Sequence, residues 1–216
     1  ISWSVNETLA GEKKVLGYYV SGNPMDQYKQ ELQSVVSTYL CDMEHCHKKS
    51  VVVAGIVNSL RVITTKSGRR MAILNIEDHT GESDVTLFSK AFEAHREKLE
   101  DDAILIIRGS IEEDKFSGGV KLLAESVQTM DDYRQQLAKK IQLQLNQHEV
   151  LDNVLERLPH VLQPHKGGVC PIVVRYFADE DQVELALGKQ WSVSPSNQLL
   201  ESLAQLCGSD NIEVLY

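Results

Sequence analysis

The sequence predicts a mostly β fold joined to an α+β fold: a five-stranded barrel is followed by a small α+β domain with a mixed sheet and preceded by a short helical segment. A β-branched run begins at Val51, and alternating apolar residues and glycine turns continue to about Met130. Before this stretch the turn residues and periodicity are those of short helices, and after it strand and helix patterns alternate. We therefore expect three parts, made of residues 1–50, 51–130 and 131–216.

The first part is expected to be a helical connector. Residues Glu12–Gly17 have a helical pattern and lead to Ser21–Pro24, where glycine and proline favour a turn. A short polar helix is expected near Asp26–Val35.

The middle part is expected to form five strands, because its runs are rich in β-branched residues, alternate with period two and are separated by turns. The strands are Val51–Ile63, Met71–Asp78, Ser83–Phe88, Ala103–Ile111 and Val120–Val127, with a short helix near Lys90–Leu99. A helix between the third and fourth of five strands is the order of an OB-type barrel, and Gly55 is a place where the long first strand can bend. An SH3-like barrel is the main alternative, but it lacks that helix.

The last part is expected to be a compact α+β domain with a mixed sheet. Its predicted strands are Ile141–Leu145, Pro171–Phe177, Val183–Leu187 and Ile212–Leu215. An apolar stripe over Val150–Leu162 indicates one helix, with Asn146 and Glu149 as a capping box. A second helix is expected to begin with Ser194 as its N-cap and to run to about Cys207.

The composition limits the function classes. The apolar content of 42% with 25% charged residues is that of a soluble globular chain, and no apolar run approaches the roughly 20 residues of a membrane span. The net charge of −9 excludes DNA binding through the electrostatic field of the whole chain, so any contact must use a local basic patch.

The four cysteines are poorly placed for a disulfide framework, which favours reduced thiols in the cytoplasm. Because the sequence starts at Ile1 without a leader, we expect a piece of a longer polypeptide.

No catalytic residue, metal ligand or cofactor is expected. Cys41, His45, Cys46 and His47 crowd one short stretch, but zinc ligands usually come as two separated pairs, so a solvated connector is favoured over a zinc site. The acidic stretches Glu112–Asp114 and Asp179–Asp181 lie between predicted strands and are interpreted as turns.

A basic patch is the most informative polar feature. The charged residues between Val51 and Ile76 are all cationic and surround the loop between the first two strands: Arg61, Lys66, Arg69 and Arg70. The loop between strands four and five, which also frames the binding face of OB folds, adds Lys115, Phe116 and Lys121. Cations can follow a phosphodiester backbone and an aromatic ring can stack on a base, so these seven residues are the predicted nucleic-acid site. Phe88 is a second aromatic candidate, with a position in the core as its alternative. The alternative is a hairpin that charge merely keeps soluble. The acidic flank from Glu97 to Asp114 predicts a one-sided, weak and salt-sensitive contact.

One segment resembles a known family. EKKVLGYYVSGNPMD at Glu12–Asp26 is similar to the E-x-x-x-LG-x-Y-x-SG-x-P segment of bacterial replicative DNA polymerase III alpha subunits. The resemblance extends through Thr65–Gly68, Glu77–Gly81, Val85–Phe88, Phe116–Gly119 and Trp191–Pro195.

The resemblance implies the C-terminal region of such a subunit, with the polymerase centre outside the chain. It implies that the OB-fold domain contacts single-stranded template DNA and that the last domain binds the tau subunit of the clamp loader. The sliding clamp would bind mainly through a motif outside the chain; Asn211–Tyr216 only loosely resembles a clamp-binding tail and is favoured as a terminal strand.

Other functions remain open at this point. The barrel could act mainly as a protein-docking scaffold with little DNA affinity, which the net charge and few aromatic residues favour. An RNA-binding module of a synthetase would not explain the first and last parts. An independent enzyme is the least favoured interpretation.

Overall fold

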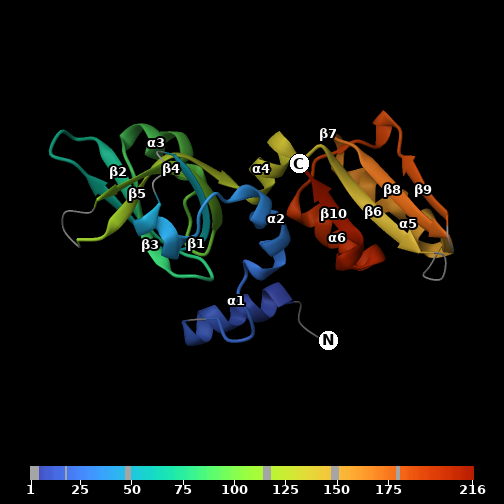
Figure 1. Ribbon diagram of the computed structural model, residues 1–216, viewed down its shortest axis with the longest axis horizontal. Helices are drawn as coiled ribbons and strands as arrows, with labels where there is room; N and C mark the ends of the chain where they lie inside the picture. Colours follow the sequence, from blue (N-terminus) through green and yellow to red (C-terminus); the bar gives the residue numbers. More distant parts are fainter. Residues whose placement is uncertain (1–4, 18, 47–49, 114–117, 147–150, 179–180) are drawn as a thin grey trace. The chain divides into compact units, whose positions relative to one another are not determined.

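The computed structural model describes residues 5–17, 19–46, 50–113, 118–146, 151–178 and 181–216 (Figure 1). The chain divides into two compact units, Ile1–Thr129 and Met130–Tyr216. Within the described residues, no helix has both the length and the apolar character that crossing a membrane requires.

The first unit contains a closed five-stranded barrel. Its strands are β1 (Val51–Thr64), β2 (Arg70–Glu77), β3 (Glu82–Leu87), β4 (Ile104–Glu113) and β5 (Val120–Thr129). They are ordered β1-β2-β3-β5-β4, with β1 closing against β4. Helix α3 (Ser89–His95) lies between β3 and β4. This arrangement confirms the predicted OB-type barrel.

Strand β1 is long because it serves both sides of the barrel. Its first half pairs with β4 as far as Ile56, and its second half pairs with β2 from Ile56 onward. Gly55 lies next to this change of partner, and a Cβ there would be 3.0 Å from the carbonyl oxygen of Glu77. The glycine therefore allows the close approach of β2.

The barrel core is built from the inward side of each strand. Alternate residues are completely buried, as the period-two pattern requires. They include Leu74, Ile76, Leu105, Ile107 and Leu122, and Phe92 of α3 joins the same cluster.

The helices before the barrel belong to the first unit. They are α1 (Val5–Leu16), α2 (Lys29–Val35) and two short 3-10 helices, Asp26–Tyr28 and Leu40–His45. The Glu12 carboxylate accepts a hydrogen bond from the Ser21 hydroxyl and others from the backbone N–H groups of Val20 (2.7 Å) and Ser21 (2.9 Å). These bonds, led by that from the Ser21 hydroxyl, hold the pKa of Glu12 below its usual value. They connect Glu12 of α1 to the backbone at Val20 and Ser21.

Asp78 anchors the helical segment to the barrel. This residue is buried, and its carboxylate accepts hydrogen bonds from the N–H of Leu40 (3.0 Å), the N–H (2.7 Å) and hydroxyl (2.6 Å) of Thr80, and the N–H of Gly81 (3.1 Å). Met43, which follows Leu40, is packed in the barrel core. The segment before β1 is therefore part of the folded unit.

The second unit is a four-stranded mixed sheet with helices. Its strands β6 (Lys140–Asn146), β8 (Ile172–Ala178), β9 (Asp181–Ala186) and β10 (Ile212–Leu215) have the order β10-β6-β8-β9. Only the central pair, β6 and β8, is parallel. Helices α5 (Leu151–Leu162) and α6 (Asn197–Cys207) supply Leu158, Leu162, Leu199 and Leu203 to the core. The predicted α+β domain with a mixed sheet is confirmed.

Two elements of this unit were not predicted, and one boundary was wrong. Helix α4 (Met130–Leu137) and the short strand β7 (Lys166–Cys170) lack a clear periodic pattern. Helix α6 begins two residues later than expected, because Ser196 rather than Ser194 is its N-cap and accepts a hydrogen bond from the N–H of Leu199 (3.3 Å). Ser194 instead donates its N–H to the carbonyl of His165 (2.9 Å). Glu149 of the predicted capping box lies outside the described residues.

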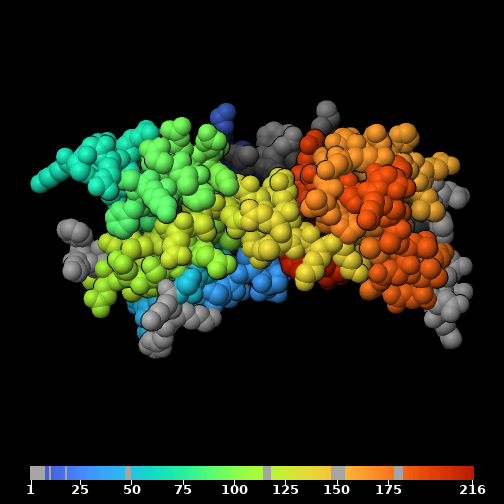
Figure 2. All heavy atoms as spheres, turned by 90° about the horizontal axis from the view of Figure 1, so that it is seen from above, coloured from blue at the N-terminus to red at the C-terminus, as the bar shows by residue number. Residues whose placement is uncertain are grey.

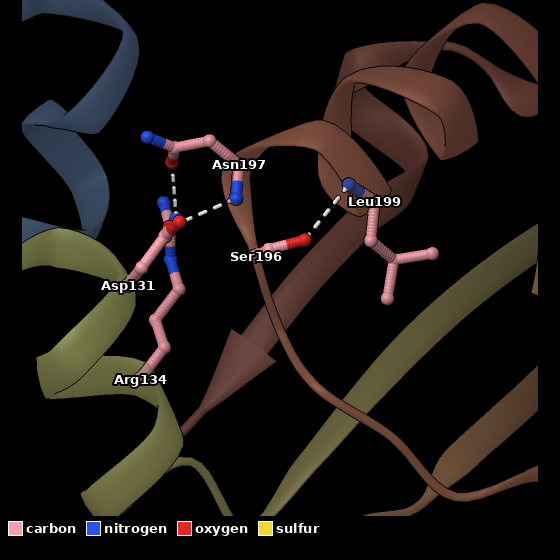
Figure 3. Close-up of polar contacts among 5 residues, drawn as sticks. All are labelled: Asp131, Arg134, Ser196, Asn197 and Leu199. Carbon is pink, nitrogen blue, oxygen red and sulfur yellow. Dashed lines mark hydrogen bonds and ion pairs between the residues drawn. The ribbon is translucent and has the colours of Figure 1, made fainter. Parts of the chain in front are cut away.

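A buried arginine joins α4 to the start of α6 (Figure 3). The Arg134 side chain is 2% exposed and donates hydrogen bonds to the side-chain oxygens of Asn197 and Asp131. Asp131 also accepts the N–H of Asn197 at 2.9 Å, in the first turn of α6. The hydrogen bonds of Arg134 and Asp131 with Asn197 join the two helices, so they hold α4 within the second unit.

Candidate nucleic-acid interface

The hairpin of β1 and β2 extends beyond the barrel core. Figures 1 and 2 show it projecting from the first unit, and Arg61–Thr64 and Lys66–Arg70 are exposed. Its turn is held by hydrogen bonds from the N–H of Thr65 to the carbonyl of Arg69 (2.8 Å) and from the N–H of Gly68 to the carbonyl of Thr65 (2.9 Å). Gly68 has a φ of +77°, a left-handed conformation that glycine adopts without strain. The loop is thus an ordered platform for its side chains.

Three of the predicted cations are presented by this hairpin. Arg61, Lys66 and Arg69 are exposed, and none of them forms an ion pair with a described residue. Arg61 is paired in register with Ile73, on the outer side of the sheet opposite the buried Leu74. We refer to Arg61, Lys66 and Arg69 together as the basic hairpin. Their charges are available to an anionic ligand.

Arg70 differs from its neighbours. Its guanidinium lies 3.0 Å from the Glu93 carboxylate and 5.6 Å from the centre of the Phe92 ring. Both partners belong to α3, so Arg70 attaches the end of β2 to that helix. Of the four predicted cations on this hairpin, it is the one whose charge is already matched.

Of the three site residues predicted near the loop between β4 and β5, the structure describes one. Lys115 and Phe116 lie outside the described residues. Lys121, on β5, is half-buried and already has an interaction partner within the protein. Its register partner on β4 is Glu112.

An exposed aromatic side chain lies near the basic hairpin. Phe88 is 57% exposed and directly follows Leu87, which pairs with Ala72 of β2. Since Leu87 is buried, the alternation of the strand directs Phe88 to the outer side, the side that also carries Met71 and Ile63. Phe88 was one of the two aromatic candidates in the sequence, with a position in the core as its alternative, and its exposure excludes that alternative.

The other half of this outer surface is acidic. Glu77 of β2 lies opposite Glu82 of β3, and Asn75 lies opposite Asp84 and donates a hydrogen bond to it (3.1 Å). Asn58 donates a hydrogen bond to Glu77 at 2.9 Å. The outer face of β1, β2 and β3 is therefore divided, with positive charge at the hairpin and negative charge at the far end.

The Cys and His residues of the connector are only partly described by the structure. Cys41 and His45 are exposed, and His47 lies outside the described residues. In the described part of the chain, no three His, Cys, Asp or Glu side chains are grouped closely enough to hold a metal ion. All four cysteines are free thiols.

Comparison with known proteins relates this geometry to a family. The family described as "DNA polymerase III subunit alpha, C-terminal domain" matches residues 157–208. The chain is 35% identical over 213 residues to DNA polymerase III subunit alpha of Vibrio cholerae, and 36% identical over 214 residues to that of Escherichia coli K12. The same subunit of Haemophilus influenzae is 32% identical over 213 residues. Each of these similarities covers 98% of the chain. The similarity supports a C-terminal fragment of a DNA polymerase III alpha subunit.

Its similarity lies in the C-terminal region of the alpha subunit. The chain spans 18% of the length of these relatives. Within this alpha-subunit region, residues 51–130 match the family described as "OB-fold nucleic acid binding domain". That range contains all five barrel strands and the basic hairpin.

Proposed function

We propose that the chain is a non-catalytic region of a replicative polymerase subunit, in which the OB barrel contacts single-stranded DNA and the second unit binds the tau subunit of the clamp loader. The observation that carries the DNA contact is the basic hairpin, where three exposed cations project from an OB barrel without ion-pair partners among the described residues. Such cations follow the phosphates of a single strand, and the exposed ring of Phe88 offers a surface on which a base can stack. Nucleotide incorporation, in this proposal, belongs to the part of the relatives that the chain does not cover.

The DNA contact is tested with the triple variant Arg61→Ala, Lys66→Ala and Arg69→Ala. Binding of labelled oligo-dT, measured by fluorescence anisotropy at about 50 mM salt, should weaken about tenfold or more, because three phosphate contacts are removed. The matched control replaces three exposed cations elsewhere, Lys29, Arg157 and Lys189, with alanine. It changes the net charge equally and should bind like the unmodified chain. Equal loss in both variants would show that overall charge, not the hairpin, governs binding.

A protein-docking role for the barrel is the second candidate. The acidic half of the outer face and the net charge of −9 favour it, since both repel nucleic acid. Under this function the chain would show no oligo-dT binding even at about 50 mM salt, where phosphate contacts are strongest.

The tau contact follows from the family resemblance and is assigned to the unit Met130–Tyr216. Immobilised tau should retain the whole chain in a pull-down, and the triple hairpin variant should be retained equally well, because its substitutions lie in the first unit. Failure of the whole chain to bind tau would remove this part of the proposal. The sliding clamp is assigned mainly to a motif outside the chain, and the site of action to the bacterial cytoplasm.

A further inference from the structure

Strand β9 leaves one side of its backbone unpaired. It is the last strand in the order β10-β6-β8-β9, and within the described part of the chain it pairs only with β8 (Figure 1). The opposite edge strand, β10, is shorter, with four residues against the six of β9. An open row of N–H and C=O groups is a template for another strand.

The side chains of β9 are also left uncovered. Val183 and Leu185 pair with Tyr176 and Val174, on the side of the sheet that packs against α5 and α6. Val174 is 4% exposed, whereas Val183 is 47% and Leu185 is 55% exposed. The helix layer therefore covers β8 and stops short of β9, and two aliphatic side chains at alternate positions face solvent.

A charged side chain in the middle of β9 is engaged within the sheet. Natural proteins blunt open edges with charged side chains or proline. The charge at the middle of β9, Glu184, is turned inward across the sheet, where its carboxylate lies 3.3 Å from the Lys140 ammonium and 3.4 Å from the Arg175 guanidinium. These two cations, Lys140 first, keep the pKa of Glu184 below its usual value.

We propose that β9 is a docking edge for an extended segment of a partner protein, which adds to the sheet as a fifth strand and covers Val183 and Leu185 with aliphatic side chains. The unpaired backbone selects an extended peptide, and the alternate exposed aliphatic residues select aliphatic partners in the same period. The net charge of −9 favours a segment that is basic at its other positions and disfavours a second copy of this chain. The inference goes beyond the proposed function, because it assigns a binding mode that holds whichever protein supplies the strand.

The probe is a labelled peptide of alternating lysine and valine, mixed with the whole chain. We expect saturable binding by fluorescence anisotropy, with slower hydrogen exchange confined to β9 and its neighbours. A peptide of the same sequence with alternate backbone nitrogens methylated keeps its charge and side chains but cannot pair as a strand. It should bind at least tenfold more weakly, and equal binding would show charge attraction instead of strand addition.

Matched variants test whether the peptide binds at β9. Val183→Lys with Leu185→Lys should weaken peptide binding at least tenfold, whereas Val169→Lys, at an 81% exposed position of β7, should leave it unchanged. Unchanged binding in the double variant overturns the proposal, as does a dimer of the free chain that the double variant dissociates. Far-ultraviolet circular dichroism checks that the variants are folded. Capture of tau is scored separately, so a chain that binds tau but not the peptide refutes this inference alone.

Discussion

At the scale of single residues, Phe88 tests whether the basic hairpin contacts bases as well as phosphates. Its ring is 57% exposed, so Phe88→Ala removes little packing. If a base stacks there, oligo-dT affinity should fall by about 1–3 kcal/mol while the salt dependence of binding stays the same. Leu155→Ala, at a 49% exposed position of the second unit, is the control and should bind normally. Unaltered affinity in Phe88→Ala would restrict the contact to phosphates.

The cysteines offer a residue-scale prediction about pH. Burial raises the pKa of the Cys170 thiol to about 11, and the residue is 1% exposed, whereas Cys41 is exposed. Because the thiolate is the reactive form, a pKa above the ambient pH leaves little of it at pH 8. A thiol reagent at pH 8 should therefore modify Cys41 rapidly and Cys170 only after unfolding, as peptide mass mapping would report. Rapid labelling of Cys170 in the folded chain would contradict its burial.

At the scale of elements, the attachment of α4 to α6 depends on Arg134. The variant Arg134→Met removes the donor to Asp131 and Asn197 and leaves two partly buried acceptors without this partner. Breaking a fully buried pair costs about 3–5 kcal/mol, but Asp131 is 39% exposed, so we expect about 2 kcal/mol. Urea denaturation measures this change. Arg157→Met, at an exposed position of α5, should stay within about 0.5 kcal/mol of the unmodified chain.

The same elements show how far sequence patterns reach. The five barrel strands and α5 were predicted because each carries its own periodicity. Helix α4 was missed because it is short and strongly polar, and its stability comes from Arg134 and Asn197, which lie 63 residues apart. The start of α6 was misplaced since three serines near Pro195 are all acceptable N-caps in the sequence. The contact of Ser194 with His165 leaves Ser196 to cap the helix.

At the scale of the whole molecule, the small number of available cations limits DNA affinity. About three phosphate contacts on a single strand give a slope near −2 for log affinity against log salt. Affinity for oligo-dT should then fall about 20-fold between 50 and 200 mM salt. In the triple hairpin variant the slope should approach zero. A steep slope in that variant would place the main contact at other cations.

The sequence by itself determined the strands of the barrel, their order and the position of the basic hairpin, because alternation and turn residues act within a few neighbours. Only the tertiary structure decided which charges are available. Arg69 and Arg70 are adjacent in the chain, yet the guanidinium of Arg70 is paired with Glu93, which lies 23 residues away. The sequence pattern therefore could not show which of the two arginines is free of an ion pair with any described residue. The exposure of Phe88 and of the β9 edge was decided in the same way, since it depends on where α3, α5 and α6 stop covering the sheets. Local patterns specify which residues form strands and turns. Packing between residues that are far apart in the sequence specifies which side chains remain free to bind.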